Sequence, residues 1–440
     1  MKGLEGIAAR RLDILVGGAA LEIGIGMRIR HWVLFLLCFL SNGPSEATDL
    51  TVEGFQQWLA SFRQTAIASG IEEQTYDSIA RSLKPDFGLP DLETAPGRRS
   101  GPGQAEFIKT PEQYLGEKYM ATLVGQGRKL FDVHRKTLES AEKTYGADPA
   151  ILLALWGRET AFGTYNLPYN ALQVLAVEAY AGRRKEDFQK QFLLAIKMVQ
   201  EGVIAPEKMK SSWAGAMGLV QFLPSDYYDY AVDGDGDGKR DIWTSVPDAL
   251  TSLANNLQHI GWQKSQPWGL EVAIPKSIDC SLAYMDVKKP VSEWVRLGVT
   301  PVAGGGFRAD LLSQEASLLM PAGTFGPAFL TFQNFQVLRL YNTSDLYALF
   351  VGHLADRIRG GGEFARKWQP VVQVASTDVE DMQKRLITLG FYNDKVDGKA
   401  GGRTRSAVGL YEKRAGLPQT CWPTAGTIGH LKTHTAAATQ

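Results

Sequence analysis

The stretch DPAILLALWGRETAFG, at residues 148–163, decides the fold that we expect. It opens with Asp, a preferred helix N-cap, and Pro, which suits the first helical position, before a long apolar run. These signals predict a helix from Asp148 to Phe162. The three- and four-residue spacing of apolar side chains extends from Leu50 to about Gly261, so we expect this helix to lie within a helical domain.

Glu159 is the candidate for chemistry on this helix. It follows Leu152, Leu155 and Trp156 at helical spacing, so its carboxyl group is expected to face inward with them. Arg158 points about 100° away on the helical wheel, so local geometry does not pair it with Glu159. Burial without a close cation raises the pKa of a carboxyl group, as a general acid requires. The ordinary alternative is a glutamate at the edge of the stripe with its carboxylate in water.

A second segment, SWAGAMGLVQFLPS at residues 212–225, alternates small and large residues. Small residues let the backbone approach a neighbour or a ligand closely, and Gln221 remains as a polar group that could bind an amide or a hydroxyl. By itself, the pattern is equally compatible with tight packing.

The composition excludes several classes of protein. With 440 residues, 44% hydrophobic and 21% charged, the chain is long enough for about three domains. Forty-seven basic and 47 acidic residues give zero net charge, so no global field favours nucleic acid. The sequence contains no Walker A or GxGxxG loop, which argues against nucleotides, and its three cysteines and six histidines are too scattered for a zinc finger.

The predicted secondary structure changes from helices to strands after about Pro267. Short strands separated by Pro and Gly clusters predict a β-containing subdomain over about 267–326, with strands at Leu270 to Ile274, Cys280 to Met285 and Ala328 to Phe332. A helix over Leu346 to Ile358 completes a first domain at 48–362. The expected remainder is a linker at 363–375, a compact helical module at 376–434 and a tail at 435–440.

Residues 1–47 have the pattern of a secretory leader. The apolar run WVLFLLCFL at 32–40 is too short to span a membrane, Arg28 and Arg30 precede it, and SEA at 45–47 suits a signal peptidase. We therefore expect export to the periplasm, with Met27 as an alternative start. A lipid anchor on Cys38 is not expected, because large leucines precede it. Cys280 and Cys421 would remain, either paired or as free thiols.

Several motifs, in this order along the chain, resemble the lytic murein transglycosylases of the membrane-bound B type. They are GRETAFG at 157–163, WAGAMG through Pro224 at 213–224, DIW at 241–243, DAL through Gly261-Trp262 at 248–262, and YNTSDLYA at 341–348. The resemblance covers about residues 55–361. It implies an α+β, mostly helical fold: a lysozyme-like catalytic domain with a small β subdomain.

The same resemblance implies site residues and a reaction. Glu159 would be the catalytic acid and base, and the saccharide groove would be lined by Ser212, Gln221, Tyr341, Asn342, Tyr347 and Tyr114. Most glycosidases need two carboxyl groups. Here Glu159 would protonate the β-1,4 oxygen between N-acetylmuramic acid and N-acetylglucosamine, then take the C6 hydroxyl proton. The sugar would close to a 1,6-anhydro end without water, and no cofactor would be required.

The C-terminal module, from Val379 to Val408, resembles the helical peptidoglycan-binding domain through LGFY at 389–392, Asp397-Gly398, Gly402, Thr404 and Arg405. The implied partner is the peptidoglycan glycan strand. We expect a monomer, with cell-wall machinery as a further partner. Two other functions stay open: a hydrolytic muramidase, in which water attacks, and a non-catalytic peptidoglycan-binding protein.

An acidic loop is a candidate calcium site. Asp233, Asp235, Asp237 and Asp241 occupy positions one, three, five and nine of an EF-hand pattern, with Gly238 at position six. Position twelve, normally a bidentate Glu, is Thr244. A structural calcium and a series of Asp-Gly turns therefore both remain open.

Overall fold

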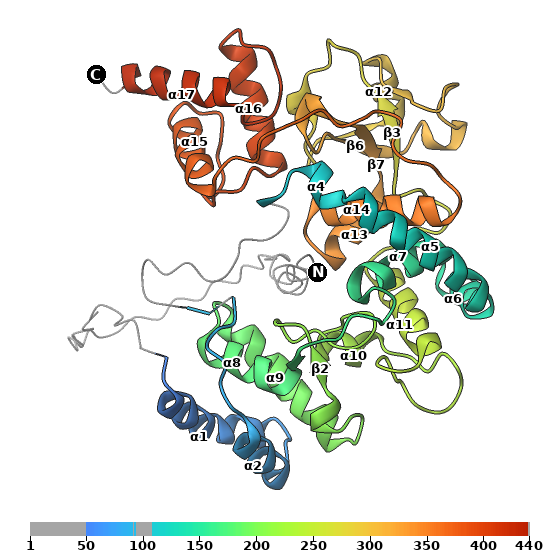
Figure 1. Cartoon of the computed structure of the whole chain (residues 1–440), viewed down its shortest axis with the longest axis vertical. Helices are drawn as coiled ribbons and strands as arrows, with labels where there is room; N and C mark the ends of the chain where they lie inside the picture. The colour runs from blue at the N-terminus through green and yellow to red at the C-terminus, as the bar shows by residue number, and fades with distance from the viewer. Residues whose placement is uncertain (1–49, 91, 94–107, 439–440) are drawn as a thin grey trace, which may run out of the picture. The chain divides into compact units, whose positions relative to one another are not determined.

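The computed structural model describes residues 50–90, 92–93 and 108–438, which form two compact units (Figure 1). The smaller unit comprises the described residues up to 93 together with 172–206. The larger comprises 108–171 and 207–438. The expected leader at 1–47 lies outside the described residues. Within those residues, no helix combines the length and apolarity that a membrane span requires.

The smaller unit is helical. It contains α1 (Val52–Ala68), α2 (Glu73–Ser82), nearly all of α8 (Ala171–Ala181), and α9 (Lys185–Gln200). The side chain of Thr51 caps α1 by accepting from Gly54 N at 3.0 Å. Trp58 stacks on Phe62 with ring centroids 5.0 Å apart, and Phe192 of α9 lies 6.1 Å from Phe62. This aromatic packing ties α1 to α9.

The helical part of the larger unit surrounds one buried helix, α7 (Pro149–Thr160). The helices around it include α5 (Glu117–Val133), α6 (Arg135–Tyr145), α11 (Val246–His259) and α14 (Asp345–Ile358), all in contact with α7. Short elements complete this part: α4 (Pro111–Leu115), β1 (Tyr169–Asn170), β2 (Lys210–Ser211), α10 (Pro224–Tyr230) and α13 (Gln333–Tyr341).

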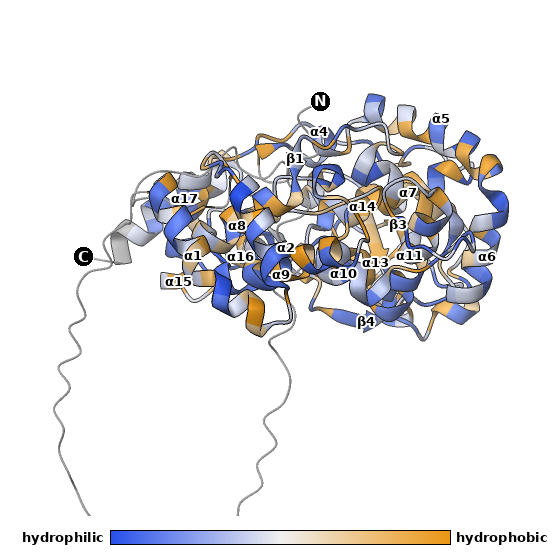
Figure 2. Cartoon of the chain, turned by 90° about the horizontal axis from the view of Figure 1, so that it is seen from below, coloured by the Kyte–Doolittle hydropathy of each residue, from blue (hydrophilic) through white to orange (hydrophobic). Residues whose placement is uncertain are grey.

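The surroundings of α7 follow from its composition. Every residue from Ala150 to Thr160 is buried, because the helix is apolar on all sides and not along one stripe only. The outer helix α5, in contrast, carries hydrophilic and hydrophobic residues along its length (Figure 2). The predicted inward position of Glu159 is therefore confirmed. The helix is also buried on all its faces, whereas one apolar stripe would bury only one face.

The β-containing subdomain is a five-stranded antiparallel sheet in the order β4-β6-β7-β3-β5. Its strands are β3 (Gly269–Ala273), β4 (Lys288–Pro290), β5 (Thr300–Pro301), β6 (Glu315–Leu319) and β7 (Ala328–Thr331), and α12 (Val291–Arg296) follows β4 directly. Trp294 of α12 is fully buried, and its indole N–H donates to Ala316 O at 2.9 Å. This bond fixes α12 to β6.

Two sequence predictions for this subdomain need correction. The expected strand from Cys280 to Met285 is wrong: Cys280–Leu282 is a 3-10 helix, since the Asp279 side chain accepts from Ser281 N and caps a turn. The sheet also extends past residue 326, because β7 pairs with both β3 and β6. The strand β6 was not predicted.

The C-terminal module consists of α15 (Ser376–Thr388), α16 (Gly402–Arg414) and α17 (Ala425–Ala438). Its core includes Val379, Leu386, Val408 and Leu431. Residues 435–438, expected as the start of a tail, continue α17. The predicted linker at 363–375 has no regular structure, but it is anchored: the N–H groups of Ala365 and Arg366 each donate to the Glu271 carboxylate at 2.8 Å.

The two remaining cysteines form a disulfide, Cys280–Cys421, across 141 residues of sequence. The bond joins the β-containing subdomain to the module. Both cysteines belong to the same hydrophobic core as Trp294. Of the two possibilities left open by the sequence, pairing is therefore the one that the structure contains.

Candidate active site

The last turn of α7 positions Glu159, which is only 3% exposed. Directly after the helix, Ala161 and Phe162 adopt positive φ angles of 47° and 58°, so the chain folds back on itself. The Phe162 ring then covers Gly157, where an added Cβ would lie 2.6 Å from the ring atom Cζ. Glycine at 157 therefore allows the close packing that holds the final turn.

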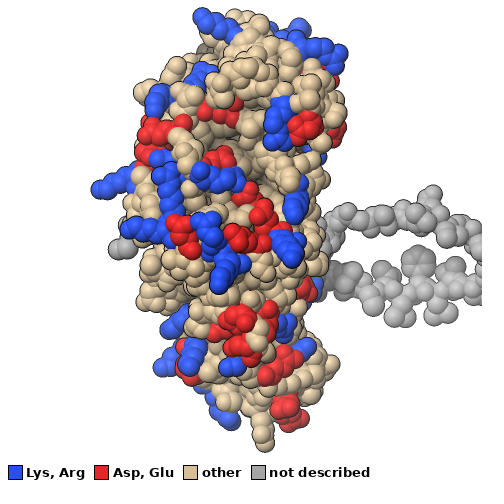
Figure 3. Space-filling view, turned by 90° about the vertical axis from the view of Figure 1, so that its right-hand side faces the viewer, with Lys and Arg blue, Asp and Glu red and all other residues tan. Residues whose placement is uncertain are grey.

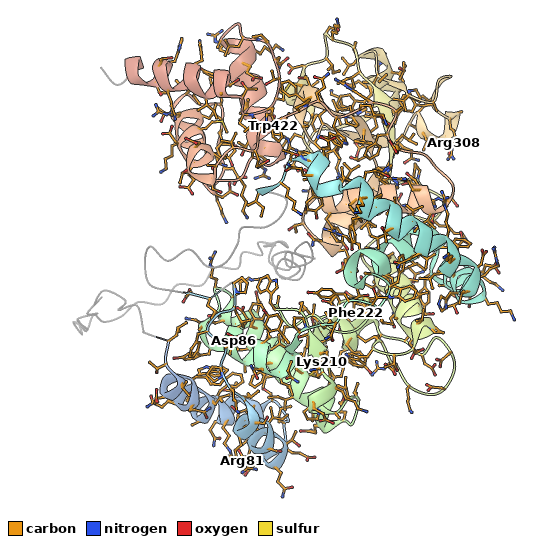
Figure 4. The ribbon with its side chains drawn as sticks, viewed as in Figure 1. Arg81, Asp86, Lys210, Phe222, Arg308 and Trp422 are labelled. Atoms are coloured by element: carbon orange, nitrogen blue, oxygen red, sulfur yellow. A yellow bond between two sulfur atoms is a disulfide. The ribbon has the colours of Figure 1, made fainter. Side chains whose placement is uncertain are left out.

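The segment 212–224 packs against the end of α7. Thr160 Oγ1 donates to Leu219 O at 2.8 Å, while Met217 and Phe222 exchange backbone hydrogen bonds of 2.8 and 2.9 Å. Gly218, at φ 70°, lies so close to Ile242 that a Cβ would be 2.6 Å from its carbonyl oxygen. The small residues therefore serve close backbone packing. Figure 4 labels Phe222, which is fully buried at the end of this turn.

Tyr347 from α14 is the direct partner of Glu159. Its hydroxyl donates to Glu159 Oε1, and its side chain has no exposed surface. Burial and the adjacent Glu159 charge raise the pKa of Tyr347 well above its ordinary value, so its hydroxyl stays protonated and remains a donor. The resemblance implied that Tyr347 lines the groove. Tyr347 is fully buried and supports the carboxyl group from behind, and the groove role stays a prediction.

Tyr341, at the end of α13, supports the neighbouring segment. It is 3% exposed and its hydroxyl donates to Val220 O, immediately before Gln221. Gln221 has a positive φ of 55°, and its side-chain Nε2 donates to Gly218 O at 3.0 Å. Tyr341 thus holds the backbone next to Gln221 from a buried position, and its role in a saccharide groove stays a prediction.

Ser212 and Asn342 lie at the edges of the same region and make local contacts. Ser212 Oγ accepts from Ala216 N at 3.3 Å. Asn342 Oδ1 accepts from Ser344 N at 3.2 Å, just before α14 begins. These bonds fix the loops that carry the two side chains.

Arg158 is buried among aromatic side chains near Glu159. It is 4% exposed, its Nη2 donates to Tyr114 Oη at 2.9 Å, and its guanidinium carbon lies 5.9 Å from the centroid of the Tyr347 ring. As the helical wheel suggested, no ion pair joins Arg158 and Glu159 among the described residues, but Arg158 lies close enough for the Glu159 charge to raise its pKa. A wheel gives only the direction of the Cβ atom, whereas a long side chain can fold back toward its neighbours. The sequence signal was an Arg beside Glu159 in a helix whose first eight residues after Pro149 are all apolar or glycine.

The acidic loop gathers four carboxylates, from Asp233, Asp235, Asp237 and Asp248, whose oxygen atoms lie within 4.8 Å of one another. The predicted member Asp241 is outside this group. Its Oδ1 accepts from Trp243 N and Thr244 N, each at 2.9 Å.

Asp248 takes the place expected for Asp241 because α11 begins beside the loop. It is 1% exposed, which raises its pKa, and it accepts from Gly234 N at 2.7 Å and Asp241 N at 2.7 Å. The spacing of acidic residues in the sequence did not indicate that the start of α11 lies next to this loop. An all-oxygen set of this kind suits a hard divalent cation such as calcium.

Comparison with known protein families gives a clear result. The model of the transglycosylase SLT domain matches residues 54–356. This chain belongs to that family. A model of a putative peptidoglycan-binding domain matches residues 375–431. The SLT domain of this chain thus includes the buried helix α7, the sheet and α14.

Individual relatives agree with this assignment. Membrane-bound lytic murein transglycosylase B of Escherichia coli (strain K12) is 31% identical over 239 residues, which are 53% of this chain and 63% of that protein, so the match spans less than two thirds of the relative. SltB3 from Pseudomonas aeruginosa, in complex with NAG-anhNAM-pentapeptide, is 39% identical, with a TM-score of 0.79 over 86% of this chain and 99% of that one.

A third relative is known in a structure that contains calcium. The Escherichia coli lytic transglycosylase Slt35, in a structure in complex with calcium, is 25% identical with a TM-score of 0.57, covering 70% of this chain and 92% of that one. The expected α+β, mostly helical fold and the resemblance to B-type lytic transglycosylases are both confirmed.

Proposed function

We propose that this chain cleaves the β-1,4 bond between N-acetylmuramic acid and N-acetylglucosamine in peptidoglycan, without water, and leaves 1,6-anhydro-N-acetylmuramic ends. The observation that carries the proposal is the buried Glu159, which receives a hydrogen bond from a tyrosine that stays protonated. The relative SltB3, in complex with a NAG-anhNAM-pentapeptide, supports this product.

In the proposed reaction, one carboxyl group acts twice. Because Tyr347 donates to Oε1, the transferable proton belongs on Oε2 of Glu159. Glu159 passes this proton to the glycosidic oxygen, while the acetamido carbonyl of the sugar supports the anomeric carbon. The resulting carboxylate then accepts the C6 hydroxyl proton as that oxygen closes on C1. Ser212, Gln221 and Asn342 are the proposed groove residues. Tyr341 holds the backbone next to Gln221, Tyr347 holds Glu159, and Tyr114 holds Arg158.

Mass spectrometry of digested sacculi tests this product. Anhydro ends are expected. Products heavier by one water, about 18 mass units, would show hydrolysis and hence a muramidase. An absence of any cleavage, with sacculus binding retained, would leave a non-catalytic binding protein.

We further propose that the C-terminal module binds glycan strands for a monomeric, exported enzyme that works beside other cell-wall proteins. The match of residues 375–431 to a putative peptidoglycan-binding domain supports the first part. The leader pattern at 1–47 supports export. Size-exclusion chromatography with light scattering tests the monomer, and N-terminal sequencing of periplasmic protein tests cleavage after residue 47.

Calcium is proposed as a structural ion only. Asp233, Asp235, Asp237 and Asp248 would hold it and relieve the repulsion between their charges. We expect a higher melting temperature in calcium than in chelator, with affinity on the order of 0.1 to 1 mM because no bidentate Glu follows. Asp237→Asn should reduce this shift. An unchanged melting temperature at several times that concentration would leave the Asp-Gly turns as the explanation.

A further inference from the structure

Arg158 is a buried cation beside the candidate catalytic carboxyl group. It is 4% exposed, and among the described residues it forms no salt bridge. Buried charges are costly unless they are compensated, so an apolar residue here would be expected to stabilise the fold more. Its presence in an otherwise apolar helix therefore requires an explanation.

Three aromatic rings surround the guanidinium group. Its carbon lies 4.5 Å from the ring centroid of Phe350, 5.1 Å from that of Tyr114 and 5.9 Å from that of Tyr347. The Tyr114 hydroxyl adds a hydrogen bond of 2.9 Å. Ring faces attract cations, and a planar guanidinium stacks on them, so these contacts replace the carboxylate that a buried arginine normally requires.

One of these rings is also the partner of Glu159. Tyr347 faces Arg158 with its ring and donates its hydroxyl to Glu159 Oε1. Any change in the position of this ring therefore moves the donor that orients the carboxyl group.

We propose that Arg158 is a positioning residue for the reaction: it fixes the Tyr347 ring, and through it Glu159, and it supplies a positive charge to the site. This inference rests on the proposed function of Glu159 as acid and then base. The charge assists the first half of the reaction, because it stabilises the carboxylate that Glu159 becomes when it gives up its proton.

The ionisable groups that face Arg158 and Glu159 come from each neighbouring helix. They are Tyr114 from α4, Tyr119 from α5 and Tyr347 from α14, and Tyr341 from α13 lies close to Tyr347. Burial alone would lower the pKa of Arg158, but Tyr114, Tyr119, Tyr347 and Glu159 raise it, so Arg158 stays charged. Burial also raises the pKa of Tyr119 and of Tyr347. Glu159 is thus the group in this set whose protonation changes in the proposed reaction.

Removal of the cation should therefore be visible in the pH profile. A cation close to a carboxyl group lowers its pKa. In Arg158→Met, we expect the alkaline limb of kcat/KM on soluble glycan oligomers to move up by about one pH unit. The kcat should fall about 10- to 100-fold, with KM little changed, because Tyr347 and Glu159 are less well held.

Arg158→Lys separates the two effects. Lysine keeps the charge but lacks the planar stacking, so it should restore the pH limb while kcat stays low. Arg81→Met, at an exposed position in the other unit (labelled in Figure 4), is the matched control and should behave as wild type. If Arg158→Met does not fold, Arg158→Lys and Tyr114→Phe provide the test, since Tyr114→Phe removes only the hydroxyl partner of Arg158 and should lower kcat.

A wild-type kcat and pH limb in a folded Arg158 variant would overturn the proposal. Additive losses in Arg158→Met and Tyr347→Phe would overturn the route through Tyr347, because residues that act through each other are not additive. Titration by ¹³C NMR measures the pKa of the Glu159 carboxyl group directly, without turnover. The signal is assigned by its absence in Glu159→Gln, and we expect the same upward shift in Arg158→Met. If the wild type yields no anhydro products, the proposed function is contradicted, but the NMR titration still tests whether Arg158 acts on Glu159.

Discussion

At the scale of single residues, the site depends on close packing around one carboxyl group. Glu159 is held from one side by Tyr347, and its helix turn is held by the ring of Phe162 over Gly157. The two successive positive φ angles at 161 and 162 bring that ring back onto the helix. Strained backbone of this kind persists where surrounding structure fixes it, which is consistent with a site that must hold its geometry.

Glu159→Gln should abolish lysis of sacculi and leave their binding unchanged. The amide keeps the shape of the side chain but has no transferable proton, so a loss of at least about 100- to 10,000-fold in rate is expected. Turbidity loss and pull-down with sacculi measure the two properties. Glu139→Gln, at an exposed position of α6, is the control. Retained lysis in the Glu159 variant would remove it from the mechanism.

Gly157→Ala should lower both stability and activity, because its Cβ would lie 2.6 Å from the Phe162 ring. We expect a loss of about 1–3 kcal/mol in the free energy of unfolding by urea, together with slower lysis. Gly125→Ala in α5 adds a methyl group where nothing lies within 4 Å, so it should be neutral or stabilising. Equal behaviour of the two variants would contradict the packing argument.

At the scale of elements, α14 links the site to the sheet. Its N-terminal part carries Tyr347, and its later part carries Gly352 and His353, where a Cβ on Gly352 would lie 2.4 Å from the Trp268 ring. His353 is stacked on Phe364, with ring centroids 3.8 Å apart. Burial, followed by the nearby charge of Arg357, lowers the pKa of His353 to about 3.

His353 should therefore make the folded state less stable in acid. Below about pH 6.5 the unfolded histidine binds a proton, whereas the folded one does so only near pH 3, so stability is lost as pH falls through this window. The slope contributed is about 1.4 kcal/mol per pH unit at most. Urea unfolding of wild type and of His353→Phe, between about pH 7 and pH 4, measures how the free energy of unfolding depends on pH. Parallel pH curves for the two proteins would show that His353 does not titrate in this way.

At the scale of the whole larger unit, the C-terminal module is attached by more than its linker. Asp279 accepts from Gln419 Nε2 at 2.7 Å and pairs with Lys413 at 2.5 Å, beside the disulfide Cys280–Cys421. Burial alone would raise the pKa of Asp279, but these hydrogen bonds and that from Ser281 lower it to about 2. On the face shown in Figure 3, Lys and Arg lie among Asp and Glu, and the net charge of the chain is zero, so the attachment relies on specific pairs and not on a general field.

Replacing both Cys280 and Cys421 with serine should lower the free energy of unfolding by about 2–5 kcal/mol, because the bond closes a long loop and lies in an apolar core. Urea denaturation measures the loss, and wild type in reductant should match the variant. The leader-free protein should also have no titratable thiol when unfolded without reductant. Two free thiols in that assay would show that the pair is reduced.

The sequence by itself determined the helix from Asp148, the inward direction of Glu159, the linked module and the family resemblance. These depend on local signals: an N-cap with Pro, apolar spacing and short motifs, which are written in neighbouring residues. Tyr347 and Gln221 were also indicated by motif, although their burial and hydrogen bonds were not.

Only the tertiary structure decided which distant groups meet. The Arg158 guanidinium reached the Tyr347 ring, Asp248 replaced Asp241 in the acidic loop, and Cys280 met Cys421 across 141 residues. In each case the partner lies on another element. The contact depends on how the elements pack and on how far the side chains reach. Periodicity along one segment carries no information on these distances, because many packings satisfy the same local pattern and only the burial of the whole core selects one.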